Sequence, residues 1–243
     1  MLKMRIKTIL NYSPNFNSQK RNFKQIKFII FHYTGMKKES AAIERLTNIQ
    51  SEVSCHYLIK NNGKIVCMVP DLYVAWHAGL SSWKGFKSLN KNSIGIEISN
   101  PGHENTYINF SKKQIQSILY LSKLLIKKYK IKSSNVLGHS DIAPFRRKDP
   151  GEKFPWKYLS KSGVGKWHSL SNKILKKNRM KKININEEKN FFKFLFKIGY
   201  SKKVLNKKTL VKAFQRRFRQ ELINGKIDQE CLLISEDLAK KLG

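Results

Sequence analysis

The chain has 243 residues, a formal net charge of +33 and 40% hydrophobic residues. This length suits one α/β domain with a smaller second domain, and the composition excludes a disordered chain because it can bury a core. The charge admits a polyanionic partner. Only nine of the 49 basic residues are Arg, however, and the excess is spread along the chain, so a compositional drift towards Lys explains it better than adhesion to an anionic surface. A specific nucleic-acid partner is not expected.

The cysteines and the N-terminal sequence give no sign of an oxidised or membrane-anchored protein. Cys55, Cys67 and Cys231 are odd in number and lack CxxC spacing, so neither a disulfide framework nor a cysteine zinc site is predicted. The first residues lack the apolar run of a secretory signal, and no segment approaches the roughly 20 apolar residues of a membrane span. We therefore expect a cytoplasmic monomer without a transmembrane segment. A periplasmic or envelope-associated location is the alternative.

The first predicted elements follow an N-terminal arm of residues 1–20. Residues 26–33 (IKFIIFHY) form a nearly continuous apolar run, which is typical of a strand buried on both faces. Residues 40–49 place apolar side chains at helical spacing. Residues 53–69 contain an Asn-Asn-Gly sequence between two apolar stretches, which predicts a hairpin.

The next elements continue the alternation of strands and helices. Residues 93–99 (SIGIEIS) alternate as a strand does, and residues 111–129 predict an amphipathic helix with a serine N-cap. Residues 135–137 predict a short strand that leads into His139. This order indicates an α/β domain over residues 21–171, with a central sheet flanked by helices.

A composition change separates the C-terminal part of the chain. Residues 172–186 are rich in Lys and Asn with little apolar periodicity, which predicts a linker. Residues 187–243 are expected to form a small helical domain. Its three predicted helices lie near residues 187–198, 208–222 and 235–242.

Three residues have the donor types of a hydrolytic zinc site, which needs three nitrogen or oxygen ligands and one open position. His32 ends the first apolar strand, His139 directly follows another strand, and Asp149 lies in a loop containing proline and glycine. Strand ends can present such side chains at one sheet edge. Spacing alone also allows two hydrogen-bonded core histidines and a turn aspartate. His103 and His168 are expected at the surface.

Several short segments occur in order along residues 10–168. They are SPNFN (13–17), FIIFHYTG (28–35), CHYLI (55–59), AWHAG (75–79), NKNSIGIEISNPG (90–102), GHSDIAP (138–144), KDPG (148–151) and FPW (154–156). Together they resemble the zinc-dependent N-acetylmuramoyl-L-alanine amidases of the type 2 amidase family, which shares its fold with the peptidoglycan recognition proteins. The resemblance implies a central mixed β-sheet flanked by helices, with Zn²⁺ in a surface groove.

The resemblance also implies roles for individual residues. The metal ligands of the family match His32, His139 and Asp149, and its catalytic glutamate matches Glu97. A carboxylate beside the zinc can take a proton from water and deliver it to the leaving amine. Strand alternation places Glu97 opposite three neighbouring isoleucines, a position that also suits an exposed strand residue.

Further matches concern the groove around the metal. Trp76 and His77 are implied as substrate-binding residues, with the edge of an aromatic core as the alternative. The family commonly has a Lys two residues before the Asp ligand, where it stabilises the oxyanion; this chain has Arg147 there and Lys148 next to the Asp. Arg147 is the predicted oxyanion donor. The alternative is that both cations are solvated.

The C-terminal sequence gives a shorter match. Residues 213–221 (AFQRRFRQE) resemble part of a small three-helix peptidoglycan-binding domain. The alternative is a basic amphipathic helix with Arg216 and Arg219 in solvent and a core face formed by Leu210, Ala213, Phe214, Arg217 and Phe218.

The resemblance implies hydrolysis of the amide between N-acetylmuramic acid, or its anhydro form, and L-alanine. The expected partner is therefore peptidoglycan or a soluble muropeptide. A non-catalytic peptidoglycan receptor is the alternative, because the same fold serves recognition alone. The complete ligand set and Glu97 favour the enzyme.

Overall fold

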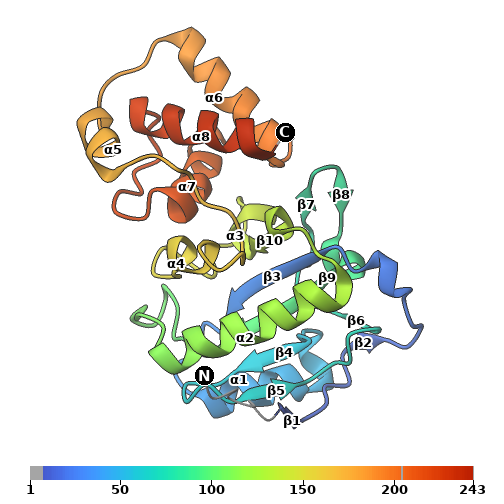
Figure 1. Cartoon of the computed structure of the whole chain (residues 1–243). Helices are drawn as coiled ribbons and strands as arrows, with labels where there is room; N and C mark the ends of the chain where they lie inside the picture. The colour runs from blue at the N-terminus through green and yellow to red at the C-terminus, as the bar shows by residue number, and fades with distance from the viewer. Residues whose placement is uncertain (1–7, 204, 243) are drawn as a thin grey trace.

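The computed structural model describes residues 8–203 and 205–242, and its centre is a six-stranded sheet (Figure 1). Strands β4 and β5 are antiparallel and the other neighbouring strands are parallel, so the predicted mixed sheet is confirmed. In sheet order the strands are β1 (Thr8–Leu10), β5 (Ile65–Cys67), β4 (Tyr57–Ile59), β9 (Ser93–Ile98), β3 (Phe28–Tyr33) and β10 (Val136–Gly138).

The expected N-terminal arm is part of the sheet system. Residues 1–7 lie outside the described residues, but β1 adds a parallel strand to the edge formed by β5. This pairing satisfies backbone groups that an open edge would leave unpaired. Two small antiparallel sheets lie beside the main one. They pair β2 (Phe16–Asn17) with β6 (Val74–Ala75) and β7 (Ser82–Trp83) with β8 (Phe86–Lys87).

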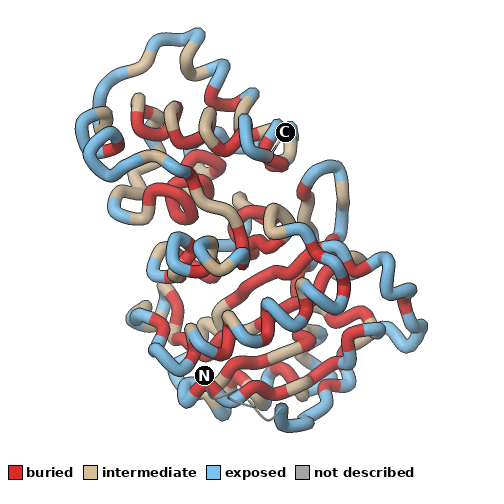
Figure 2. Tube along the Cα trace, viewed as in Figure 1, coloured by how far each residue is buried: buried red, intermediate tan, exposed pale blue. Residues whose placement is uncertain are grey.

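Strand β3 is buried on both faces, as its apolar run predicts (Figure 2). Ile29 and Phe31 lie in a cluster covered by helix α2 (Lys112–Tyr129), which begins at the predicted Ser111 cap. Phe28 and Ile30 join a different cluster on the opposite face. The sheet therefore needs a second layer on that face.

Shorter helices complete the first part of the chain. Helix α1 (Glu39–Thr47) confirms the predicted helix and packs Leu46 in a cluster with Leu58 of β4. Helix α3 (His139–Ile142) directly follows β10, and α4 (Trp156–Ser160) lies between the sheet and the C-terminal helices (Figure 1).

The C-terminal part of the chain contains four helices within the described residues. They are α5 (Asn172–Asn178), α6 (Ile185–Ile198), α7 (Lys207–Phe218) and α8 (Gln229–Leu242). The predicted linker at residues 172–186 therefore holds a helix and the start of another. Ser171 caps α5, and Leu175 is buried in the cluster that also contains Phe191 of α6. Tertiary packing thus forms a helix that the weak local pattern does not predict.

These helices supply the missing layer on the second face of the sheet. A single apolar cluster joins Phe28 and Ile30 of β3 with Phe191 of α6 and Phe214 of α7. Because the cluster is continuous, the helices are packed on the first part of the chain and are not tethered to it by a loose connection.

Two arginines at the C-terminal end of α7, one of them just after the helix, differ from the expectation of a solvated basic face. Arg216 and Arg219 are 8% and 3% exposed. Arg219 forms a buried ion pair with Asp228, and Arg216 lies 3.8 Å from Glu152. Acidic partners thus allow charged side chains to enter the interior.

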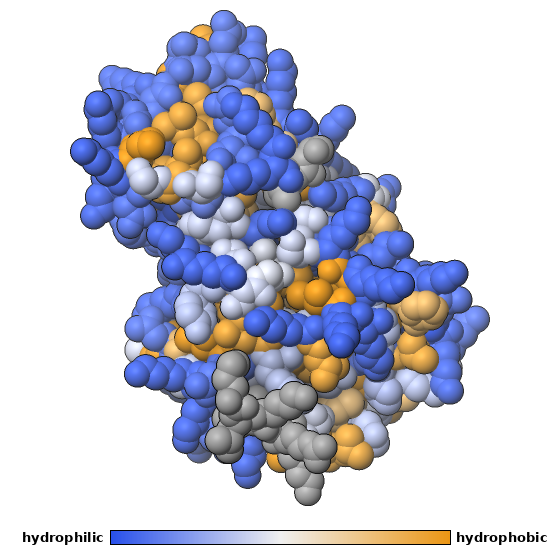
Figure 3. Space-filling model, viewed as in Figure 1, coloured by the Kyte–Doolittle hydropathy of each residue, from blue (hydrophilic) through white to orange (hydrophobic). Residues whose placement is uncertain are grey.

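The polar composition of the chain is visible on its surface. The face drawn in Figure 3 is covered largely by hydrophilic residues. Among the described residues, the helices lack the length and apolar character needed to cross a membrane.

Candidate active site

The three predicted metal ligands meet at the carboxyl ends of β3 and β10. These strands are parallel neighbours, so His32 near the end of one and His139 just after the other come together. Their Nδ1 atoms are 2.9 Å apart, and each lies 3.0 Å from Oδ2 of Asp149. All three side chains are buried, and their donor atoms lie within 4.8 Å of one another.

A directional chain of hydrogen bonds fixes the ring of His32. The Ser93 hydroxyl donates to the carbonyl of Leu89 (2.6 Å), so its oxygen accepts from Nε2–H of His77 (3.1 Å). Nδ1 of His77 can then accept from Nε2–H of His32 at 3.0 Å. This order leaves the Nδ1 lone pair of His32 directed at Asp149.

His139 has the same orientation by a simpler route. Its Nε2 lies 3.1 Å from the carbonyl of Ala78, which can only accept a hydrogen bond, so Nε2 carries the proton. Two imidazole lone pairs and a carboxylate oxygen therefore face one another at about 3 Å. Such donors repel unless a cation lies between them, and this donor set fits zinc.

The electrostatics give these groups the protonation states that metal binding requires. Burial, followed by the charge of His139, lowers the pKa of His32 to about 4. Burial opposes the ionisation of Asp149, but the neighbouring imidazoles of His139 and His32 hold the pKa of this carboxyl well below its usual range. At neutral pH His32 is neutral and Asp149 is ionised.

Glu97 lies beside His32 in the sheet. The two residues are register partners on parallel strands, so their side chains share a face. Oε2 of Glu97 is buried and has no hydrogen-bond partner within residues 8–203 and 205–242. Burial and then Asp149 raise the pKa of Glu97 to about 8, while Arg147 and Arg45 act in the opposite direction. A carboxyl that titrates near neutral pH suits proton transfer.

A cavity of about 370 Å³ opens above these groups. Trp76 is half-buried on its wall, with Nε1 donating to Oδ1 of Asn17. His77 also borders the cavity but is only 8% exposed, and it lies against the far side of the His32 ring. Trp76 therefore presents surface to the cavity, whereas His77 mainly holds the ring of His32.

The glycine of the SIGIEIS strand makes room for this support. A Cβ on Gly95 would lie 2.3 Å from the ring of His77, a distance that no side chain tolerates. The close approach of His77 to the sheet thus requires glycine at this position. Ser93 and Gly95 thus hold His77 in place, and the sequence analysis did not identify them.

The three basic residues before Asp149 have different surroundings. Arg146 donates to the carbonyls of Ala78 and Leu80 and so ties the loop to the groove wall. Arg147 and Lys148 are exposed on the cavity rim. The charge of Arg147 lowers the pKa of both Glu97 and His32.

Two histidines expected at the surface are not free there. His103 is half-buried, with Nδ1 2.9 Å from the Tyr33 hydroxyl and Nε2 3.0 Å from Glu152, and it borders the cavity. His168 is 7% exposed. The residues that surround these two histidines are distant in sequence, so no local sequence pattern predicts their burial.

Comparisons with known proteins show the family of this chain. Residues 22–152 match the family model described as N-acetylmuramoyl-L-alanine amidase. The N-acetylmuramoyl-L-alanine amidase AmiD of Escherichia coli (strain K12) is 36% identical over 238 residues, which cover 91% of this chain and 85% of AmiD. The 1,6-anhydro-N-acetylmuramyl-L-alanine amidase AmpD of Citrobacter freundii is 39% identical over 104 residues, or 43% of this chain and 54% of AmpD.

Solved structures are similar over nearly the whole chain. The complex of E. coli AmiD with anhydro-N-acetylmuramic acid-L-Ala-D-γ-Glu-L-Lys has a TM-score of 0.80 and 34% identity, covering 93% of each chain. AmpDh3 from Pseudomonas aeruginosa in complex with anhydromuramic pentapeptide has a TM-score of 0.79 and 29% identity, covering 94% of this chain and 96% of AmpDh3. The likeness therefore includes the C-terminal helices.

Proposed function

Because the chain belongs to the N-acetylmuramoyl-L-alanine amidase family and hydrolyses the amide between N-acetylmuramic acid, or its anhydro form, and L-alanine, we propose that this reaction takes place at a zinc ion held by His32, His139 and Asp149. The observation that carries the proposal is the pair of Nδ1 lone pairs directed at one carboxylate oxygen. With two neutral imidazoles and one carboxylate as ligands, a bound zinc ion would keep a net positive charge and one open position for water.

The protein groups around the ion have separate roles in the proposed reaction. When bound, zinc supplies a Lewis acid that polarises the scissile carbonyl and lowers the pKa of the attacking water. Glu97 accepts the proton from that water and returns it to the leaving nitrogen of L-alanine. Arg147 donates to the carbonyl oxygen as negative charge develops there. His77 and Ser93 hold the His32 ring in its ligating orientation.

Product analysis tests this function directly. We would incubate the protein with soluble anhydro-muropeptides and with intact sacculi, and identify the products by mass spectrometry. The expected products are peptides with a free L-alanine amino terminus and sugars that retain the lactyl group. Products cut at a glycosidic or peptide bond would contradict the proposal, and binding without products would favour a receptor. The ratio of the two rates identifies the preferred substrate.

The two cations on the rim give a sharper test of the mechanism. Arg147→Ala should lower kcat by roughly 10²–10³, the usual effect of losing one oxyanion donor, whereas Lys148→Ala should change it little. Arg147→Lys should keep much of the activity because it keeps the charge. Steady-state kinetics on a soluble muropeptide would measure all three variants. The reverse order of the alanine variants would assign the role to Lys148.

We also propose that the C-terminal helices hold the enzyme on the glycan of the wall. The similarity of residues 213–221 to a peptidoglycan-binding sequence supports this role. A truncated chain cannot test it cleanly, because these helices share a core with the sheet.

Binding to sacculi can instead be measured with the intact chain and the slow variant Glu97→Gln. Specific binding should survive about 1 M salt, where the Debye length falls to about 3 Å and the attraction of the +33 charge is screened. Pelleting assays at low and high salt would measure it. Loss of all binding at high salt would mean that the interaction depends on charge alone.

A further inference from the structure

Asp141 lies two residues after the proposed ligand His139. Its carboxylate accepts hydrogen bonds from the C-terminal part of the chain. Its Oδ2 accepts from the backbone N–H of Gly138 at 2.7 Å and from Nη1 of Arg217 on α7. Its Oδ1 accepts from the hydroxyl of Tyr200, which follows α6, at 3.0 Å. The side chains of Asp141 and Arg217 are 1% and 4% exposed. A carboxylate so deeply buried depends on its countercharge.

The guanidinium of Arg217 contacts the chain both before and after His139. Its second nitrogen, Nη2, donates to the carbonyl of Val136 in β10 at 3.0 Å, while Nη1 reaches Asp141 in α3. The guanidinium also lies over the ring of Trp156, with its central carbon 4.1 Å from the ring centroid. His139 lies between these two anchored points, at the junction of β10 and α3.

The same short helix is linked to another of the proposed ligands. The backbone N–H of Ser140 donates to the carbonyl of Asp149 at 2.8 Å. A displacement of α3 would therefore move His139 and the backbone of Asp149 together. Metal affinity is sensitive to such displacements because the donor atoms must converge at about 2 Å from zinc.

We infer that Arg217, assisted by Tyr200, is a positioning residue of the metal site, and that the C-terminal helices are a structural part of the catalytic centre. The inference rests on the proposed zinc function, since its effect is exerted through His139. Arg217 lies too deep to touch substrate and acts only through Asp141 and β10. The basic motif of α7 thus has a second role, separate from any contact with the wall.

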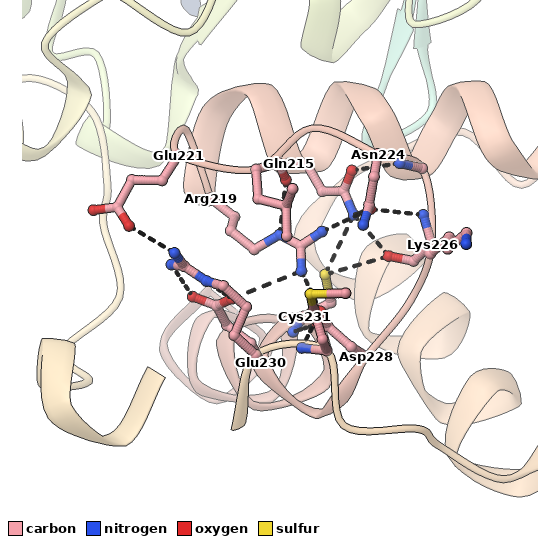
Figure 4. A network of polar contacts seen from close by, with 12 residues as sticks. Gln215, Arg219, Glu221, Asn224, Lys226, Asp228, Glu230 and Cys231 are labelled. Atoms are coloured by element: carbon pink, nitrogen blue, oxygen red, sulfur yellow. Dashed lines mark hydrogen bonds and ion pairs between the residues drawn. The ribbon is translucent and has the colours of Figure 1, made fainter. Parts of the chain in front are cut away.

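Helix α7 and the residue after it also offer a matched control. Arg219 is equally buried and is paired with Asp228, with Glu230 at 3.7 Å. Its remaining hydrogen bonds go to Leu222 and Asn224, within the C-terminal network drawn in Figure 4. Arg219→Met therefore breaks a comparable ion pair without touching the segment that carries His139.

The test compares Arg217→Met with Arg219→Met in the full chain. Zinc affinity is measured by competition with a chromophoric chelator, at a temperature well below both melting points. We expect Arg217→Met to weaken zinc binding by roughly 10–100-fold, the usual effect of losing an outer partner of a ligand. Arg219→Met should lower the melting temperature but leave zinc affinity within about twofold. The visible spectrum of the cobalt-substituted protein should change only in the Arg217 variant.

Two milder variants keep the test decisive if Arg217→Met does not fold. Tyr200→Phe removes one bond to Asp141, and Arg217→Lys keeps the charge but not both contacts; each should weaken zinc binding less than Arg217→Met. Equal zinc affinity in these variants and the wild type would overturn the inference, as would an equal loss in Arg219→Met. A wild-type protein that binds no zinc would instead reject the proposed function.

Discussion

Removal of zinc should leave the protein unable to hydrolyse muropeptides, and activity should return when one zinc ion per chain is restored. Without the ion, the site offers no Lewis acid, and Glu97 alone faces an unactivated water. The ligands are poised for rebinding, because Asp149 is ionised and His32 is held neutral with its Nδ1 lone pair inward. Elemental analysis alongside turnover would measure the stoichiometry.

His139→Ala is the control for this experiment. It should lose both activity and the rise in melting temperature that zinc gives the wild type, because binding stabilises only a folded state that holds the metal. Ala78 would keep its backbone carbonyl, so the groove wall stays in place. Full turnover in protein shown to be metal-free would refute the zinc mechanism.

The proposed ligands could be identified from sequence because each has a simple relation to the chain. His32 and His139 follow strands that are parallel neighbours, and parallel strands present their carboxyl ends at one edge. Glu97 could be placed by strand alternation together with the family motif. The motif also identified Asp149, whose loop has no regular pattern.

The supporting residues could not be identified in this way. The bond from His77 to His32 depends on the space left by Gly95, and Arg217 is 76 positions from Asp141. Helical periodicity places Arg217 on the apolar face of its helix but does not identify Asp141 as its partner, and it predicts Arg219 in solvent. These contacts exist only after the sheet and the C-terminal helices have packed together.

Glu97→Ala should retain zinc while turnover falls by roughly 10²–10⁴, the usual range for loss of a general acid–base group. Zinc retention is expected because Glu97 lies beside the ligands without being one of them. Glu97→Gln should be as slow, since an amide cannot accept the proton. Turnover on a soluble muropeptide and bound zinc would be measured on the same preparations. Near-normal turnover would assign proton transfer to another group.

The same glutamate should also limit the stability of the metal-free protein. Its pKa is raised from 4.5 to about 8 in the folded state, chiefly by burial. Between these values the unfolded chain is ionised while the folded protein keeps the proton, so stability falls as pH rises through this window. Glu97→Gln removes that loss. Metal-free Glu97→Gln should therefore be more stable than the wild type by about 1–3 kcal/mol near neutral pH, after allowance for partial exposure to the groove.

Denaturant unfolding of the metal-free proteins at several pH values would measure this difference. The gain should be absent near pH 4, grow as pH rises and level off above about pH 8. Glu104→Gln, which neutralises an exposed carboxylate on the same cavity, is the control and should show no such growth. A constant difference across the pH range would mean that the pKa of Glu97 is not raised in the folded protein, so that its carboxylate is a weaker proton acceptor than the mechanism requires.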